Sequence, residues 1–141
     1  MPAVPTYAIS TILEAGYLES VGRARAALAE QGFGVLTEID VAATMKAKLG
    51  KDMPPHLILG ACNPPLAHQA LTLEPSIGLL LPCNVVVRTL DDAHTLVEAM
   101  DPAVMVKATG NAELSAVADE ARSRLTAALG ALAGSPAAVA S

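Results

Sequence analysis

The sequence predicts a two-layer α+β domain in which a mostly antiparallel sheet of about five strands packs against two long helices. The chain has 141 residues, the length of one domain. Hydrophobic residues make up 52% and charged residues 16%, so the chain can bury a substantial core. Two long stretches with helical periodicity stand among several short strand-like stretches. We expect a single domain over residues 6–132 and a flexible tail over residues 133–141.

The first part of the chain alternates strand and helix patterns. Residues 6–12, with β-branched and aromatic side chains, predict a strand, and residues 35–39 predict a second one. Between them, residues 17–31 repeat apolar side chains at three- and four-residue intervals. That spacing predicts an amphipathic helix, with Gly32 as its C-terminal cap.

The middle of the chain predicts two capped helices around a third strand. Asp40 is expected to cap a short helix that ends at Gly50. Residues 56–62 alternate as a strand. Asn63 and the two prolines after it mark the start of a helix that ends before Pro75.

The second half predicts a hairpin between two helical regions. Residues 77–89 have a strand-like composition, with a bulge or break at Pro82, because proline cannot donate within a central ladder. A short turn leads to a strand over residues 95–100, so these two strands form a hairpin. After a brief helical turn, Asn111 is expected to cap the last and longest helix.

Composition argues against several classes of partner. Nine basic and 14 acidic residues give a net charge of −5, and only three residues are aromatic, so neither phosphate binding nor base stacking is favoured. No apolar run approaches the ~20 residues that cross a membrane, and no secretory signal is visible. Two cysteines make no disulfide framework. We therefore expect a soluble cytoplasmic protein that binds neither nucleic acid nor membranes.

The apolar character of the chain also predicts self-association. Its mean hydropathy is +0.45, and it carries few charges. Such a composition favours a surface that is partly covered by a second subunit. We expect a homodimer.

The most informative residue for chemistry is Cys62. It directly precedes Asn63, the expected helix cap, so its sulfur is expected beside the positive end of a helix. Such a position favours the thiolate, which is the nucleophile and the metal ligand. The alternative is that Cys62 is a small buried side chain at the end of a strand, as free cysteines often are.

A second cysteine could act with it, depending on the strand register. If the fourth strand begins after Pro82 and pairs with the third, Cys83 lies near Cys62; if residues 77–81 pair first, the two sulfurs are far apart. Two nearby thiols would suit a soft metal such as Cu(I) or a reversible disulfide. His68, in the helix after Cys62, could join them. The remaining candidate ligand or redox residues are the asparagines that follow the cysteines, Asn63 and Asn84.

No pattern of histidines and carboxylates indicates an enzyme, and no motif assigns a cofactor. The lysines at 46, 48 and 51 form the nearest thing to a basic cluster, and we interpret them as a solvated helix face.

Four segments in order resemble the bacterial family called domain of unknown function 302. They are residues 32–40 (GFGVLTEID), 58–64 (ILGACNP), 78–87 (GLLLPCNVVV) and 100–102 (MDP). The resemblance implies a two-layer α+β domain whose topology is similar to that of TATA-box-binding-protein-like folds, with extra short helices, and often a homodimer. It brings no established reaction, cofactor or catalytic residue, and a fold alone implies no DNA binding.

Two hypotheses follow for the function. The first is a small binding or sensing domain in which Cys62 is a reactive thiol and Cys83 its partner, responding to a soft metal, an electrophilic small molecule or an oxidant. The second is a structural or protein-interaction domain without chemistry of its own, in which both cysteines are packing residues.

Overall fold

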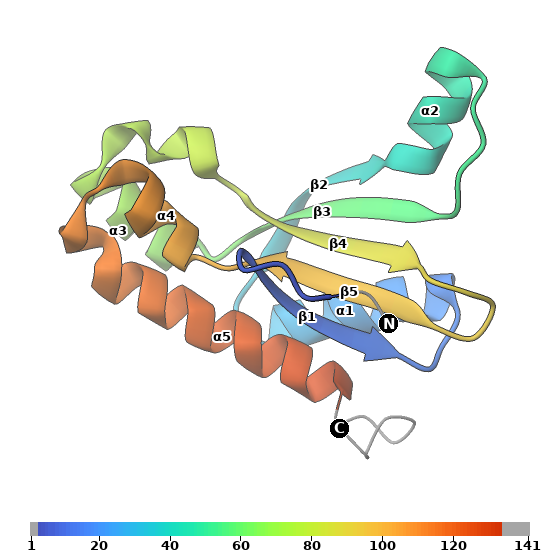
Figure 1. Cartoon of the computed structure of the whole chain (residues 1–141). Coiled ribbons are helices and arrows are strands. Elements are labelled where there is room, and N and C mark those ends of the chain that lie inside the picture. The colour runs from blue at the N-terminus through green and yellow to red at the C-terminus, as the bar shows by residue number, and fades with distance from the viewer. Residues whose placement is uncertain (1–2, 134–141) are drawn as a thin grey trace.

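Five antiparallel strands form a single sheet in the computed structural model, which describes residues 3–133 (Figure 1). In chain order the strands are β1 (Ala8–Leu13), β2 (Gly34–Asp40), β3 (His56–Cys62), β4 (Cys83–Thr89) and β5 (Thr95–Met100). Their order across the sheet is β1-β5-β4-β3-β2, and each neighbouring pair is antiparallel. β1 and β2 are therefore the edge strands.

Helices connect the strands and complete the chain. They are α1 (Tyr17–Glu30), α2 (Val41–Leu49), α3 (Pro64–Leu73), α4 (Ala103–Thr109) and α5 (Ser115–Ala133). Two 3₁₀ helices accompany them, η1 (Pro75–Leu80) and η2 (Ala112–Leu114). In Figure 1, α3 and α4 gather at one end of the sheet, whereas α2 projects beyond the opposite end.

The main core lies between the sheet and the two long helices, α1 and α5. Strand alternation supplies one side of it: Leu57, Leu59 and Ala61 of β3 are buried, whereas Ile58 between them is only half-buried. The helices supply the other side through residues such as Leu28 and Leu125. This arrangement confirms the predicted two-layer α+β class.

A second, smaller core fills the end of the sheet where α3 and α4 lie. Ile77 of η1, Met105 of α4 and Leu114 of η2 pack there with Val117 of α5. Segments that are far apart in the sequence therefore meet at this end, where β3 ends and β4 begins.

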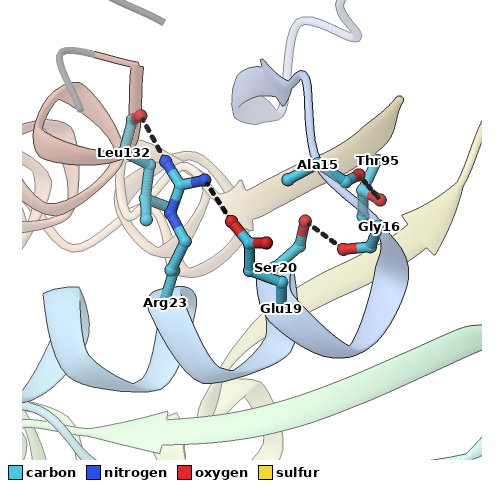
Figure 2. A network of polar contacts seen from close by, with 7 residues as sticks. All are labelled: Ala15, Gly16, Glu19, Ser20, Arg23, Thr95 and Leu132. Carbon is cyan, nitrogen blue, oxygen red and sulfur yellow. Dashed lines mark hydrogen bonds and ion pairs between the residues drawn. The ribbon is translucent and has the colours of Figure 1, made fainter. Parts of the chain in front are cut away.

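Polar contacts attach α1 to the sheet and to α5 (Figure 2). The buried Thr95 hydroxyl donates to the Ala15 carbonyl over 2.8 Å, and the buried Ser20 hydroxyl donates to the Gly16 carbonyl over 2.8 Å. At the other end of the network, Arg23 reaches the Leu132 carbonyl over 3.3 Å and the Glu19 carboxylate over 3.2 Å. The Thr95 and Ser20 bonds fix the turn between β1 and α1, and Arg23 joins α1 to the end of α5.

Most of the predicted caps are present where the sequence placed them, and Asn111 is the exception. The Asp40 carboxylate accepts from Ala43 N over 2.9 Å at the start of α2, and Gly50 ends that helix with φ 66°. Gly32 follows α1 with φ 82°. Asn111 caps the short η2 rather than α5 itself, which begins four residues later.

One predicted element is wrong in its first half. Residues 77–89 were expected to be strand-like, but residues 77–80 belong to η1, and β4 begins only at Cys83. Ile77 turns into the second core, where it is 1% exposed. Packing against α4 and α5 therefore overrides the strand-like composition of this apolar run. Ala133 is the last residue of α5, and the expected tail after it lies outside the described residues.

Candidate functional site

The two cysteines meet at the end of the sheet where β3 finishes and β4 starts. Cys83 lies directly opposite Ala61 in the β3–β4 ladder, so Cys62 is the next residue along. Cys62 itself pairs with Gly34 of β2. The structure therefore selects the register in which the two cysteines are neighbours.

The two thiols differ in exposure and in environment. Cys83 is 7% exposed, whereas Cys62 is half-buried. Burial, and secondarily the neighbouring Cys62 charge, raise the pKa of Cys83 to about 11. Cys83 is therefore a protonated thiol near neutral pH.

The start of α3 is built on Asn63, as the sequence predicts. The Asn63 side-chain oxygen accepts from Leu66 N over 3.3 Å, and prolines occupy the first turn of the helix. Cys62 immediately precedes this cap. The sulfur-bearing residue thus lies beside a helix start, where unpaired backbone N–H groups give a positive end.

Asn63 also joins three elements. It is 8% exposed, and its amide nitrogen contacts the Gln31 carbonyl over 3.5 Å. Arg124 of α5 donates to the same carbonyl over 3.2 Å. The Asn63 side chain is therefore occupied in holding the start of α3 against the end of α1, which indicates a positioning role.

Both cysteines line a single apolar cavity between the end of the sheet, α3, α4 and α5. Its lining is mostly small and aliphatic, and consists of Phe33, Ala61, Cys62, Asn63, Leu66, Ala67, Ala70, Leu81, Pro82, Cys83, Met105, Val117 and Ala121. The space open to the centres of water-sized molecules is about 30 Å³. That is about twice the ~10–15 Å³ that one water needs, so the cavity fits only a very small group without opening.

The other two candidate residues lie elsewhere. His68 is exposed on α3 and does not line the cavity. Asn84 is exposed on β4 and borders a shallow depression with Tyr7 and Val86. Within residues 3–133, no group of three or more histidine, cysteine or acidic side chains is placed to hold a metal ion. The structure therefore brings together Cys62, Cys83 and Asn63.

Some residues around the site carry no signal in the sequence. Met105, Val117 and Ala121 form the far wall of the cavity, and they come from helices that begin at least 20 residues after Cys83. Gly60, close to the cavity, is another residue that the sequence analysis did not single out: a Cβ there would lie 2.1 Å from Thr37 Oγ1 and 2.8 Å from Pro82 Cγ. A lone glycine inside a strand pattern signals such a close approach, so this one could have been found.

The fold and this site define a small α+β domain with a two-cysteine cavity at one end of its sheet. The chain belongs to the family described as domain of unknown function DUF302, whose model matches residues 9–132. A crystal structure of an uncharacterized conserved DUF302 protein from Bacillus stearothermophilus is similar, with a TM-score of 0.81 and 28% sequence identity. The similarity covers 89% of this chain and 98% of that one.

No curated protein matches the chain. The family membership confirms the resemblance drawn from the four sequence segments. As to membranes, none of the helices in the described residues is both long enough and apolar enough to span a bilayer.

Proposed function

We propose that this DUF302 protein is a small oxidant-responsive sensing domain in which the Cys62 thiol reacts first and the Cys83 thiol is its partner. The observation that carries the proposal is the cavity that both cysteines line, at neighbouring positions across β3 and β4. Cys62 is half-buried and therefore accessible to a small reagent. Cys83 is buried, and it reacts only afterwards, with the oxidised Cys62. A cytoplasmic location, where thiols are kept reduced, suits such a response.

The reagent that we name is a hydroperoxide. The Cys62 sulfur attacks the terminal oxygen, the O–O bond breaks, an alcohol leaves with the thiol proton, and Cys62 becomes a sulfenic acid. The Cys83 thiol then attacks that sulfur, an S–S bond forms and water leaves. Two thiols lose two electrons in total, and one hydroperoxide is reduced. Two molecules of a small thiol restore the starting state by exchange: they leave joined by a disulfide, and both cysteines return to thiols.

Strand geometry supports the pairing of the two residues. Residues directly opposite one another are about 5 Å apart and neighbours along a strand about 3.3 Å, so the Cα atoms of Cys62 and Cys83 lie about 6 Å apart, within the range that a disulfide spans. Alternation turns adjacent side chains to opposite faces, so β3 must rotate at Cys62 for the bond to form. Cys62 lies beyond the last β3–β4 pair, so such a rotation leaves that ladder intact and disturbs only the terminal Cys62–Gly34 pair of β3 with β2.

The raised pKa of Cys83 bears on the rate of the second step. Disulfide formation requires the thiolate only in passing, but a thiol that stays protonated supplies little of it. Because Cys83 stays protonated near neutral pH, its attack on the sulfenic acid is slow. The sulfenic acid should therefore live long enough to be trapped.

The proposal is tested with the full chain and a stoichiometric alkyl hydroperoxide near neutral pH. Mass spectrometry should show loss of two hydrogens from the wild type, and Cys83→Ser should accumulate a sulfenic acid at Cys62 that dimedone captures. Cys62→Ser should react much more slowly. The matched control is the same chain unfolded in urea. If folded Cys62 is oxidised no faster than the unfolded thiol, or if Cys62→Ser reacts as fast as the wild type, the proposal is wrong.

A structural or interaction domain is the second candidate, and one observation favours it. α2 buries no side chain in the chain's own core. That feature is independent of the cysteines.

A further inference from the structure

The cavity that both cysteines line offers almost no polar contact to a molecule that enters it. None of the residues that line it is charged, and the polar ones are Cys62, Asn63 and Cys83. The Asn63 side chain is already occupied, because its oxygen accepts from Leu66 N over 3.3 Å and its nitrogen contacts the Gln31 carbonyl over 3.5 Å. A charged or strongly polar group would therefore enter this space without a partner, which is unfavourable.

The cavity is also small. The space open to the centres of water-sized molecules is about 30 Å³. One water needs ~10–15 Å³, and apolar cavities that bind benzene measure ~150 Å³. The space next to the cysteines therefore holds about two non-hydrogen atoms, and it is too small for a ring or a branched chain.

Small side chains on two facing helices create this space. Ala70 of α3 and Ala121 of α5 both line it, and they are 2% and 5% exposed. Each contributes a single methyl group where a larger side chain would fill the gap. Met105 of α4 and Val117 of α5 complete the far wall. The size of the cavity is therefore set by side chains that take no part in thiol chemistry.

The first oxidation step determines where the organic part of a hydroperoxide lies. The Cys62 sulfur attacks the terminal oxygen along the O–O bond, so the sulfur and the two oxygens are in line. The alkyl group, which is carried by the leaving oxygen, then points away from the sulfur. An alkyl group that points into the cavity leaves water for an apolar surrounding, which is favourable.

We propose that this cavity makes the Cys62 thiol selective for uncharged alkyl hydroperoxides of one or two carbons, with Met105, Val117 and Ala121 as the residues that limit the size of the alkyl group. This selectivity rests on the proposed function and leaves its chemistry unchanged: thiol and hydroperoxide give a sulfenic acid and methanol or ethanol. Hydrogen peroxide has no alkyl group to bury. tert-Butyl hydroperoxide carries a branched group that exceeds the space.

The first test compares hydrogen peroxide, ethyl hydroperoxide and tert-butyl hydroperoxide on the full chain. Mass spectrometry of the peptide that contains Cys62 measures the rate at which its thiol is lost. Each rate is divided by the rate for the same thiol in the urea-unfolded chain, because the three reagents differ in intrinsic reactivity. The resulting ratio for ethyl hydroperoxide should exceed that for hydrogen peroxide about tenfold, since each buried carbon is equivalent to about fourfold. The ratio for tert-butyl hydroperoxide should fall well below that for ethyl hydroperoxide.

The second test changes the far wall in both directions. Val117→Ala removes two methyl groups and should raise the ratio for tert-butyl hydroperoxide about tenfold. Ala121→Val adds two methyl groups and should lower the ratio for ethyl hydroperoxide to that for hydrogen peroxide. The matched control is Val97→Ala, the same deletion at a fully buried residue of the main core that does not line the cavity, and it should leave all three ratios unchanged. Thermal unfolding checks that each variant is folded, and Val117→Ala decides the outcome if Ala121→Val does not fold.

Failure of this selectivity can be distinguished from failure of the proposed function. Equal ratios for the three reagents overturn the selectivity, and so does an equal shift in Val117→Ala and Val97→Ala. If folded Cys62 still reacts faster than the unfolded thiol in those cases, the proposed function stands. If none of the three reagents oxidises folded Cys62 faster than the unfolded thiol, the proposed function is wrong, and the selectivity is wrong with it.

Discussion

The Thr37 hydroxyl occupies the space where a side chain at Gly60 would begin: a Cβ built on Gly60 would lie 2.1 Å from Thr37 Oγ1. Pro82 Cγ would lie 2.8 Å from the same position. The pairing of β2 with β3 shifts by a bulge between Val35 and Thr37, and Gly60 is the residue opposite Thr37. The missing side chain at Gly60 therefore lets β2 and the residue before β4 close on β3, two residues from Cys62.

The substitution Gly60→Ala should destabilise the protein by about 1–3 kcal/mol, because either Thr37 or Pro82 has to move. Urea unfolding measures the change. Gly130→Ala in α5 is the control: nothing lies within 4 Å of its Cβ position, and the helix should gain up to about 1 kcal/mol. Thr37→Ala should recover part of the loss caused by Gly60→Ala, and strict additivity of the two changes would contradict the proposed clash.

Asn63→Ala should cost about 1–2 kcal/mol, because the cap on Leu66 N and the contact with the Gln31 carbonyl are both lost. Asn63→Asp keeps the capping oxygen and loses only the donor, so it should cost less than Asn63→Ala. Equilibrium unfolding of the three proteins compares them. Equal losses for both variants would show that the cap contributes nothing.

The pKa of Cys83 predicts a loss of stability at alkaline pH. The folded chain raises that pKa from 9.0 to about 11, mainly by burial. Below about pH 8.5 the thiol is protonated in both states, so its contribution is fully present. As the pH rises towards 11, the Cys83 thiol ionises in the unfolded chain but not in the native one. The free energy of unfolding therefore falls by about 2–3 kcal/mol.

Unfolding free energies of the wild type and Cys83→Ala, measured from pH 7.5 to 11, isolate this effect. The difference between them should shrink as the pH rises, because tyrosine and lysine titrations are common to both proteins. Cys62→Ala is the matched control and should keep the alkaline slope. A constant difference between wild type and Cys83→Ala would contradict the buried, protonated thiol.

Thr95→Val should cost about 1–3 kcal/mol, since valine keeps the shape but leaves the Ala15 carbonyl without its 2.8 Å donor (Figure 2). Thr72→Val removes the same type of hydroxyl-to-carbonyl bond on the exposed side of α3, and should change stability by less than about 0.5 kcal/mol. Thermal unfolding distinguishes them. A similar shift in Tm for both variants would show that the buried bond does not fix the turn after β1.

Local signals in the sequence were sufficient for most of the architecture. Asp40, Asn63 and Gly50 act on the backbone within a few residues of themselves, so the ends of α2 and the start of α3 could be read directly. The alternation along residues 56–62 predicted that Leu57, Leu59 and Ala61 share one face of the strand, and in the structure that face is the buried one. The sequence also singled out Cys62 beside a helix start, because that relationship spans two residues.

Packing decided what local signals left open. Residues 77–81 are apolar enough for a strand. In the structure, however, Ile77 packs with Met105 and Leu114 in the second core, and residues 77–80 belong to η1. An apolar run does not say against which surface it will be buried, so composition alone could not choose. That choice moved the start of β4 to Cys83 and made it the neighbour of Cys62. The sequence by itself thus determined most of the helices and strands and the two candidate thiols. Only the tertiary structure decided that Cys62 and Cys83 share one cavity, because strand register depends on contacts between segments that are distant in the chain.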